Sequence, residues 1–350
     1  MGYRIAINGY GRIGRSLLRA VLERADCQAL SIVAINEPAD PEAIALLTRY
    51  DSNHGRLGRS VTLKPGQLVI DHHVIQLLPG LAPEELPWRE LDIDLVLECS
   101  GCPADRAVAQ THLDAGARRV LFSQPATPDI DLTVVRGFND SDLRPTHRIV
   151  SAGSCTTNCL VPMLDILQTE FGLVHGAATT LHAVMNDQPV SDTLSGASLR
   201  HVRAALNAVI PVDTALERGI ARLMPKLEGK LDCLHLRVPT TTVSAMDVTF
   251  TLAQATSTAA VRSAFMDASE GRWRGLFGTC SDPVSSIDFA GDARSGVIDL
   301  TQIRVVDDQL VKLIAWFDNE WGYANRMVDI ALQLKALAGQ RPRRVRNPLH

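Results

Sequence analysis

The chain has 350 residues, of which 46% are hydrophobic and 21% are charged. This composition fits a folded protein of about two domains, because a domain holds roughly 150 residues, and it excludes disordered, collagen-like and coiled-coil chains. With 35 Lys and Arg against 39 Asp and Glu, the formal net charge of -4 provides no broad basic field, so nucleic acid is not expected as a partner.

The sequence also bears on the location of the protein and on the state of its cysteines. No run of 18 apolar residues occurs, and the start of the sequence lacks the basic flank, apolar core and cleavage site of a secretory signal, so we expect a cytoplasmic protein without a membrane partner. The seven cysteines are odd in number and dispersed, which favours free thiols over a disulfide framework.

The first 37 residues predict a strand, a glycine turn, a helix and a second strand. Residues 3–7 form the first apolar strand and residues 31–35 the second, and the helix between them has apolar residues at helical spacing. The turn reads Gly9-x-Gly11-x-x-Gly14. In this motif the glycines permit a tight turn, close approach to a pyrophosphate and close helix–strand packing.

Glu37 follows the second strand, 23 positions after Gly14. Its carboxylate suits the diol of an adenosine ribose and would repel a 2′-phosphate, so the pattern predicts NAD rather than NADP as the cofactor.

Later segments predict two halves of different class. Short apolar strands at residues 94–98, 119–123 and 148–151 indicate a parallel doubly wound sheet. Residues 246–252 instead alternate apolar and polar side chains, and residues 297–300, 303–306 and 310–317 continue that pattern. The fold class expected is therefore α/β: a Rossmann sheet followed by an α+β domain with a mixed or antiparallel sheet.

The end of the sequence predicts an amphipathic helix and a tail. Apolar residues recur at helical spacing from Met327 to Leu337, and Gly339 is a suitable stop. The arginine-rich residues 340–350 then predict a solvated basic tail.

Cys155 is the first candidate for chemistry. It lies in the polar run of residues 154–159, which offers little apolar context to bury a thiol, and leucines at helical spacing follow it. A helix N-terminus at this position would stabilise the thiolate. His182 ends the strand-like residues 177–181 and is a candidate base, although spacing alone does not pair it with Cys155. Alternatively, Cys155, Cys159 and His182 could form a non-enzymatic redox or metal module.

Four longer motifs resemble the glyceraldehyde-3-phosphate dehydrogenase family, and the likeness extends over residues 3–338. They occupy residues 6–15, 154–159, 236–240 and 316–323. Within that family, residues 35–37, 182–188 and 210–214 look most like the erythrose-4-phosphate dehydrogenase branch.

The resemblance implies a role for each matching residue, a bound NAD and a homotetramer. Cys155 would be the nucleophile, with His182 as its base and oxyanion partner. NAD would be held by Gly9, Gly11, Arg12, Ile13, Gly14, Glu37, Ser123 and Asn319. Substrate would contact Ser154, Thr156, His201, Thr214, Ala215 and Arg237. Residues 1–153, with the helix at about 320–338, would form the NAD-binding domain, and residues 154–319 the catalytic domain.

The implied reaction is oxidation of D-erythrose 4-phosphate to 4-phosphoerythronate, a precursor for pyridoxal phosphate synthesis, through a thiohemiacetal and a thioester on Cys155. The alternative is a phosphorylating glyceraldehyde-3-phosphate dehydrogenase. Met185 stands where glycolytic members carry a threonine, and His201 stands where the family usually has an arginine. Met185 cannot donate a hydrogen bond to phosphate, and His201 supplies a full charge only when protonated. These two residues therefore favour water as the attacking group.

Overall fold

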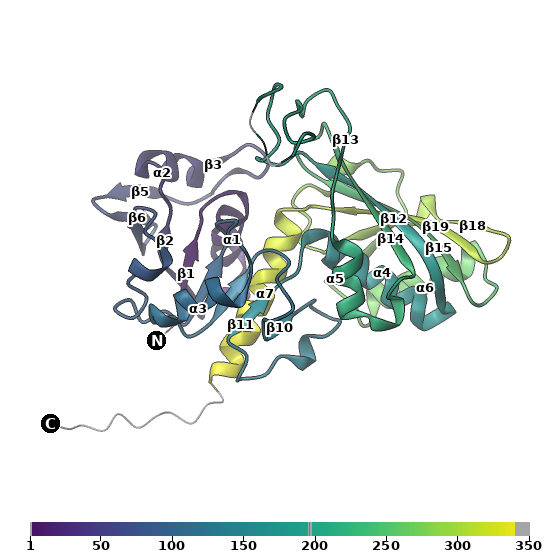
Figure 1. Ribbon diagram of the computed structural model, residues 1–350, viewed down its shortest axis with the longest axis horizontal. Coiled ribbons are helices and arrows are strands. Elements are labelled where there is room, and N and C mark those ends of the chain that lie inside the picture. The colour runs from purple at the N-terminus through teal and green to yellow at the C-terminus, as the bar shows by residue number, and fades with distance from the viewer. Residues whose placement is uncertain (1, 195, 197, 340–350) are drawn as a thin grey trace.

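The computed structural model describes residues 2–194, 196 and 198–339 (Figure 1). Its first large sheet has the strand order β10-β11-β9-β8-β1-β2-β7-β6-β5 in the described residues. The strands are β1 (Tyr3–Asn8), β2 (Leu30–Asn36), β5 (Val61–Lys64), β6 (Gln67–Ile70), β7 (His73–Leu78), β8 (Leu95–Glu98), β9 (Val120–Phe122), β10 (Leu132–Thr133) and β11 (Ile149–Ser151).

The parallel Rossmann sheet predicted from the sequence is confirmed. Strands β10 to β7 pair in parallel, with β1 between β2 and β8. Residues 61–78 add an antiparallel extension, β5-β6-β7, that the sequence patterns did not reveal. The helices of this half are α1 (Arg12–Glu23), α2 (Pro41–Arg49) and α3 (Arg106–Asp114), and a two-stranded ribbon of β3 (Tyr50–Asp51) and β4 (Gly55–Arg56) follows α2.

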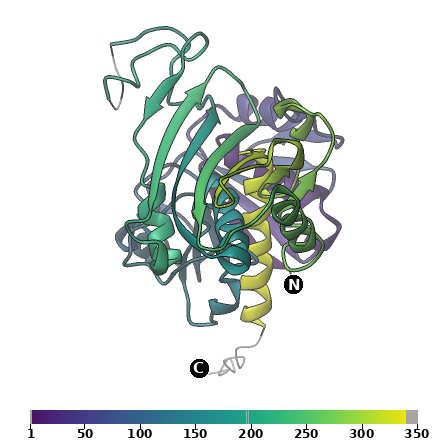
Figure 2. The same cartoon turned by 90° about the vertical axis from the view of Figure 1, so that its right-hand side faces the viewer.

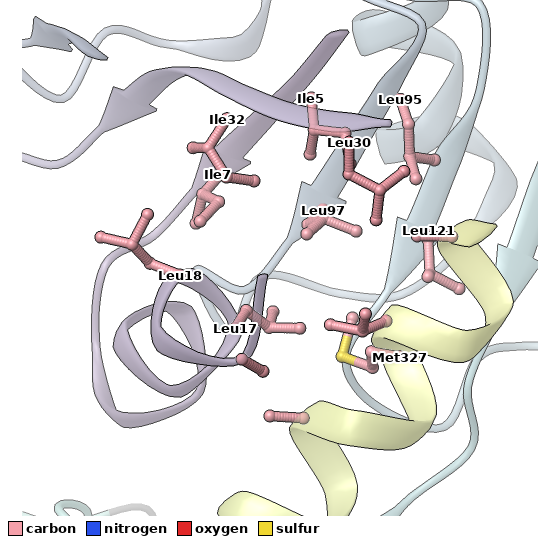
Figure 3. Close-up of a cluster of buried hydrophobic side chains, with 14 of the residues drawn as sticks. Ile5, Ile7, Leu17, Leu18, Leu30, Ile32, Leu95, Leu97, Leu121 and Met327 are labelled. Carbon is pink, nitrogen blue, oxygen red and sulfur yellow. The ribbon is translucent and has the colours of Figure 1, made fainter. Parts of the chain in front are cut away.

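The last helix, α7 (Trp321–Ala338), returns to this first sheet and packs beside α1. Figure 3 shows Met327 of α7 in one cluster with Leu17 and Leu18 of α1 and strand residues such as Leu97 and Leu121. Burial of these apolar side chains is the main force that holds α7 in place. We therefore propose that residues 320–338 fold with residues 1–153, as expected from the sequence. The predicted tail, residues 340–350, lies outside the described residues.

The second sheet is mixed, as predicted. Its strands are β12 (Leu173–Ala183), β13 (Ile210–Val212), β14 (Leu231–Val238), β15 (Ser244–Leu252), β16 (Gly278–Cys280), β17 (Val297–Asp299), β18 (Arg304–Val306) and β19 (Leu310–Phe317). Strand β15 pairs antiparallel with β12 and β19, whereas β12 and β14 are parallel. Helices α4 (Cys155–Phe171), α5 (Leu216–Leu223) and α6 (Thr258–Glu270) cover one face, where they share a core with the alternate apolar residues of β15.

The described residues between β12 and β13, which are 184–194, 196 and 198–209, form the projecting segment, and part of it extends beyond the second sheet in both views (Figures 1 and 2). Large apolar side chains are exposed along it, among them Val190, Leu194 and Leu199. None of the described helices is both long and apolar enough to cross a membrane.

A set of five charged side chains, the Arg12 cluster, joins the two halves: Arg12, Asp51, His54, Asp318 and Glu320. The guanidinium of Arg12 donates to Asp51 Oδ2 at 2.6 Å and to Glu320 Oε1 at 2.7 Å. His54 lies between the carboxylates, with Nδ1 3.3 Å from Asp51 Oδ1 and Nε2 3.6 Å from Asp318 Oδ2. These contacts connect the start of α1 to the junction between β19 and α7.

The Arg12 cluster predicts a pH-dependent stability. Burial by itself would lower the pKa of His54, but the carboxylates of Asp318 and Asp51 outweigh it and raise this pKa to about 9. Because the unfolded pKa is about 6.5, the added stability, about 3 kcal/mol, is complete below pH 6.5 and is lost as the pH rises through 9. The urea midpoint of unfolding should fall over this range in the wild type and much less in His54→Gln. An equal fall in both proteins would contradict this, and His72→Gln, which alters an exposed histidine, is the control.

Candidate active site

The glycine turn between β1 and α1 is shaped for a ligand with a phosphate backbone. Gly9 has φ +87°, and a Cβ there would lie 2.4 Å from Ser100 Cα. A Cβ on Gly14 would lie 2.4 Å from the carbonyl oxygen of Gly9, whereas one on Gly11 would meet no atom within 4 Å. The space above Gly11 is therefore open, and no side chain caps the amides at the start of α1. These amides, which include those of Arg12 and Ile13, suit a pyrophosphate.

Glu37 lies directly beside this turn. Its Oε2 accepts a hydrogen bond of 2.7 Å from the amide of Tyr10, and its Oε1 accepts one of 3.3 Å from the amide of Ala39. Ser123 follows β9, where its amide donates to Glu98. The carboxyl ends of β1, β2 and β9 share one edge of a parallel sheet, so the residues predicted to hold NAD from the first half lie along that edge.

Cys155 is the first residue of α4, as the sequence predicted. Ser154 caps the helix by accepting the amide of Thr157 at 3.0 Å. The loop before it is held by Tyr323, whose hydroxyl donates to the carbonyl of Gly153, and by Asn158, whose side-chain amide donates to Ala152. The thiol therefore sits at a helix N-terminus on a loop that hydrogen bonds fix.

The structure pairs Cys155 with His182, which spacing alone did not. Cys155 Sγ lies 3.5 Å from His182 Nε2, and His182 Nδ1 lies 2.7 Å from the carbonyl oxygen of Ala183. Because a carbonyl only accepts, Nδ1 carries the proton in the neutral ring and Nε2 presents its lone pair to the thiol. This geometry suits transfer of the thiol proton to Nε2.

The expectation of an exposed thiolate at Cys155 is wrong. The residue is half-buried and packs against the cores of both halves, since the polar run lies where they meet. Burial raises the pKa of the thiol to about 12, although the amides of Thr156 and Cys155 act in the opposite direction. Burial also lowers the pKa of His182. The resting pair is therefore a thiol beside a neutral imidazole, and the thiol needs His182 to lose its proton.

Arg237, predicted to meet the substrate, is already paired. Strands β12 and β14 place it opposite His182. Its guanidinium makes a two-pronged contact with Asp187, with Nη2 2.8 Å from Oδ2. His201 Nε2 lies 3.5 Å from the same carboxylate, and Met185 Sδ lies 3.8 Å from Arg237 Nη2.

The remaining predicted substrate residues lie in two places. Ser154 Oγ and Thr156 Oγ1 are 2.8 Å apart at the start of α4, beside Cys155. Thr214 and Ala215 precede α5, and the Thr214 hydroxyl accepts from the amide of Leu216. Within the described residues, no hydrogen bond joins the Thr214 side chain to the Cys155–His182 pair.

Asn319 is positioned through a residue that the sequence did not single out. The Ser244 hydroxyl accepts the amide of Ala183 at 3.1 Å and donates to Asn319 Oδ1 at 3.0 Å. This fixes the Asn319 amide relative to the residue after His182. With Oδ1 as the acceptor from Ser244, the NH₂ group is the end that can donate to a carboxamide such as that of NAD.

Two family models match the chain. Glyceraldehyde 3-phosphate dehydrogenase, NAD binding domain, matches residues 3–106, and glyceraldehyde 3-phosphate dehydrogenase, C-terminal domain, matches residues 154–319. Together they cover well over half of the chain. The chain belongs to the glyceraldehyde-3-phosphate dehydrogenase family. It is thus an NAD-dependent dehydrogenase, and the open turn above Gly11 with Glu37 beside it fits that cofactor.

The alternative of a metal module gains no support from the described residues, among which no group of three His, Cys, Asp or Glu side chains could hold a metal ion. Cys159 is fully buried in the core of the second half. Sequence reasoning missed Asp187 as the partner of Arg237, and it missed His235, whose ring stacks on His182. His235 could have been found from its spacing, because it stands two residues before Arg237 on one strand and so shares its face.

Proposed function

We propose that this member of the family oxidises D-erythrose 4-phosphate to 4-phosphoerythronate, with water rather than inorganic phosphate releasing the product. The observation that carries the choice of water is the pairing of Arg237 with Asp187. The proposed oxidation is supported by the positions of the residues around the Cys155–His182 pair.

The first step is addition of the thiol to the aldehyde. His182 Nε2 accepts the Cys155 proton as Sγ bonds to the carbonyl carbon, and the carbonyl electron pair moves to oxygen. The amide of Cys155, at the helix N-terminus, and the newly formed imidazolium stabilise that oxygen. The imidazolium then returns this proton to the oxygen, which gives a neutral thiohemiacetal and a neutral His182.

The second step leaves a thioester on Cys155. The chemistry that bound NAD would supply is that of an acceptor for the hydride of the former aldehyde carbon. His182 accepts the hydroxyl proton of the thiohemiacetal, and Asn319, held by Ser244, would orient the cofactor's carboxamide. His182 releases that proton to solvent and then accepts a proton from water as the water oxygen attacks the thioester carbon. The C–S bond breaks, and the imidazolium gives its proton to Sγ as the acid leaves.

The paired Arg237 disfavours inorganic phosphate as the attacking group. Asp187 faces both Arg237 and His201, and Arg237 holds the pKa of Asp187 below its usual range despite its partial burial. A phosphate dianion would have to displace this ionised carboxylate from a buried guanidinium. Water carries no such cost. The substrate's own phosphate would instead contact Ser154, Thr156 and Thr214, together with His201 when it is protonated.

We also propose that the chain forms the homotetramer typical of the family. The exposed Val190, Leu194 and Leu199 of the projecting segment support this, because apolar side chains gathered on one segment are typical of a protein interface.

Steady-state rates of NADH formation test the proposed function. Erythrose 4-phosphate and glyceraldehyde 3-phosphate should each be assayed with and without inorganic phosphate. We expect a higher kcat/KM for the four-carbon sugar. The rate should not depend on inorganic phosphate, because Asp187 neutralises the Arg237 guanidinium that phosphate would have to bind. Cys155→Ala should be inactive with both sugars. Preference for the three-carbon sugar together with a phosphate requirement would identify the phosphorylating enzyme instead.

Removal of the Asp187 carboxylate should make the Arg237 guanidinium available to inorganic phosphate. In Asp187→Ala, Arg237 is left without its carboxylate, so inorganic phosphate should speed product release severalfold, on the order of tenfold at most because Asp187 is half-exposed. Detection of the acyl phosphate with hydroxylamine distinguishes this product from the acid. Asp192→Ala, which breaks the exposed pair with Arg203, is the matched control. If Asp187→Ala stays indifferent to phosphate, Asp187 does not determine the acceptor.

A further inference from the structure

We propose that His235 is a positioning residue for the base His182, held against it by ring stacking. The two imidazole rings have centroids 5.0 Å apart and planes inclined by 26°. This inference rests on the proposed function, because it assumes that His182 takes the proton of Cys155.

The sheet explains how the two rings meet. Strands β12 and β14 run in parallel, with Thr180 opposite His235 and His182 opposite Arg237. Alternate residues of a strand share a face, so His235 emerges beside His182 on the face that carries Arg237. On the opposite flank of β12, beyond β15, the ring of Phe317 makes an edge-to-face contact with His182, with centroids 6.4 Å apart and planes at 71°.

Ring stacking restricts a tilt of the His182 ring that its two polar contacts leave free. Its two nitrogens point to Cys155 and to the carbonyl of Ala183, which fixes their directions. The ring can still tilt about the line through those two contacts. The rings of His235 and Phe317 approach from opposite flanks and limit this tilt, which keeps the Nε2 lone pair aimed at the thiol.

The charge state of His235 suits this position. Burial, together with the nearby His182 and Arg237, lowers its pKa to about 3, so the ring is neutral at pH 7. When His182 becomes an imidazolium, a neutral π-face favours that charge, whereas a second cation would oppose it. The other charged groups that act on His182 are Asp187 and Glu320, which favour its protonation, and Arg237, which disfavours it.

The hydrogen bonds of the described residues include none that joins a ring nitrogen of His235 to another side chain or to the backbone. The contribution we assign to His235 is therefore that of a flat neutral ring rather than a proton relay. A phenyl ring should consequently replace it, whereas a branched aliphatic side chain of similar burial should not.

The test compares His235→Phe and His235→Leu by the rate of iodoacetamide alkylation of Cys155 at pH 7, with mass spectrometry to identify the modified cysteine. Alkylation should be about tenfold slower in His235→Leu and within about twofold of wild type in His235→Phe. With erythrose 4-phosphate, kcat should fall in parallel while KM stays unchanged. If His235→Leu does not fold, His235→Gln, which lacks the aromatic ring, replaces it with the same expectation.

Two further variants separate the possible outcomes. His182→Asn should react more slowly than any His235 variant. His72→Leu, which removes a tilted ring contact with His73, should react as the wild type does. Wild-type reactivity in His235→Leu with slow reaction in His182→Asn would overturn this proposal alone. Equal loss in His235→Phe and His235→Leu would also overturn it. Wild-type reactivity in His182→Asn would overturn the role of His182 in the proposed function, and this inference with it.

Discussion

The Arg12 guanidinium binds carboxylates from two distant parts of the chain, and the positions of the cofactor turn and of Asn319 both depend on it. Arg12 is the first residue of α1, whose amides face the space above Gly11. Glu320, one of its partners, follows Asn319 directly. These side chains are largely buried, and Arg12 binds both carboxylates at once, so removal of the guanidinium would weaken both connections. The cluster therefore sets the relative placement of two residues predicted to contact NAD, which lie more than 300 positions apart in the sequence.

The Cys155 thiol, the proposed nucleophile, lies at the same junction, and this position raises its pKa. Packing between two apolar cores raises the pKa of Cys155 more than the helix N-terminus lowers it, so a neighbouring base is required. His182 meets that need because its own burial keeps it neutral and its contact with Ala183 fixes its tautomer. A buried thiol also has fewer routes to adventitious oxidation than an exposed thiolate. Reactivity would then arise when the aldehyde is in place.

Much of this arrangement could be predicted from the sequence, since the signals concerned are local. Glycine spacing revealed the turn, apolar periodicity revealed the strands beside it, and leucine spacing placed Cys155 at the start of α4. Neither the burial of Cys155 nor the ion pair between Arg237 and Asp187 could be predicted, because both depend on how distant segments pack. The parallel register of β12 and β14, which brings His235 to His182, is likewise set by pairing between strands about 50 residues apart. The hairpin extension from β5 to β7 has short, half-exposed strands whose patterns are too weak to read.

The central claim is that Cys155 carries the substrate as a thioester. Rapid acid quenching of the enzyme with erythrose 4-phosphate and NAD, followed by digestion and mass spectrometry, would test it most directly. The account predicts a 4-phosphoerythronyl group on the peptide that contains Cys155, absent when NAD is omitted. Turnover with no acyl group on any cysteine, or with the group on a cysteine other than Cys155, would contradict it.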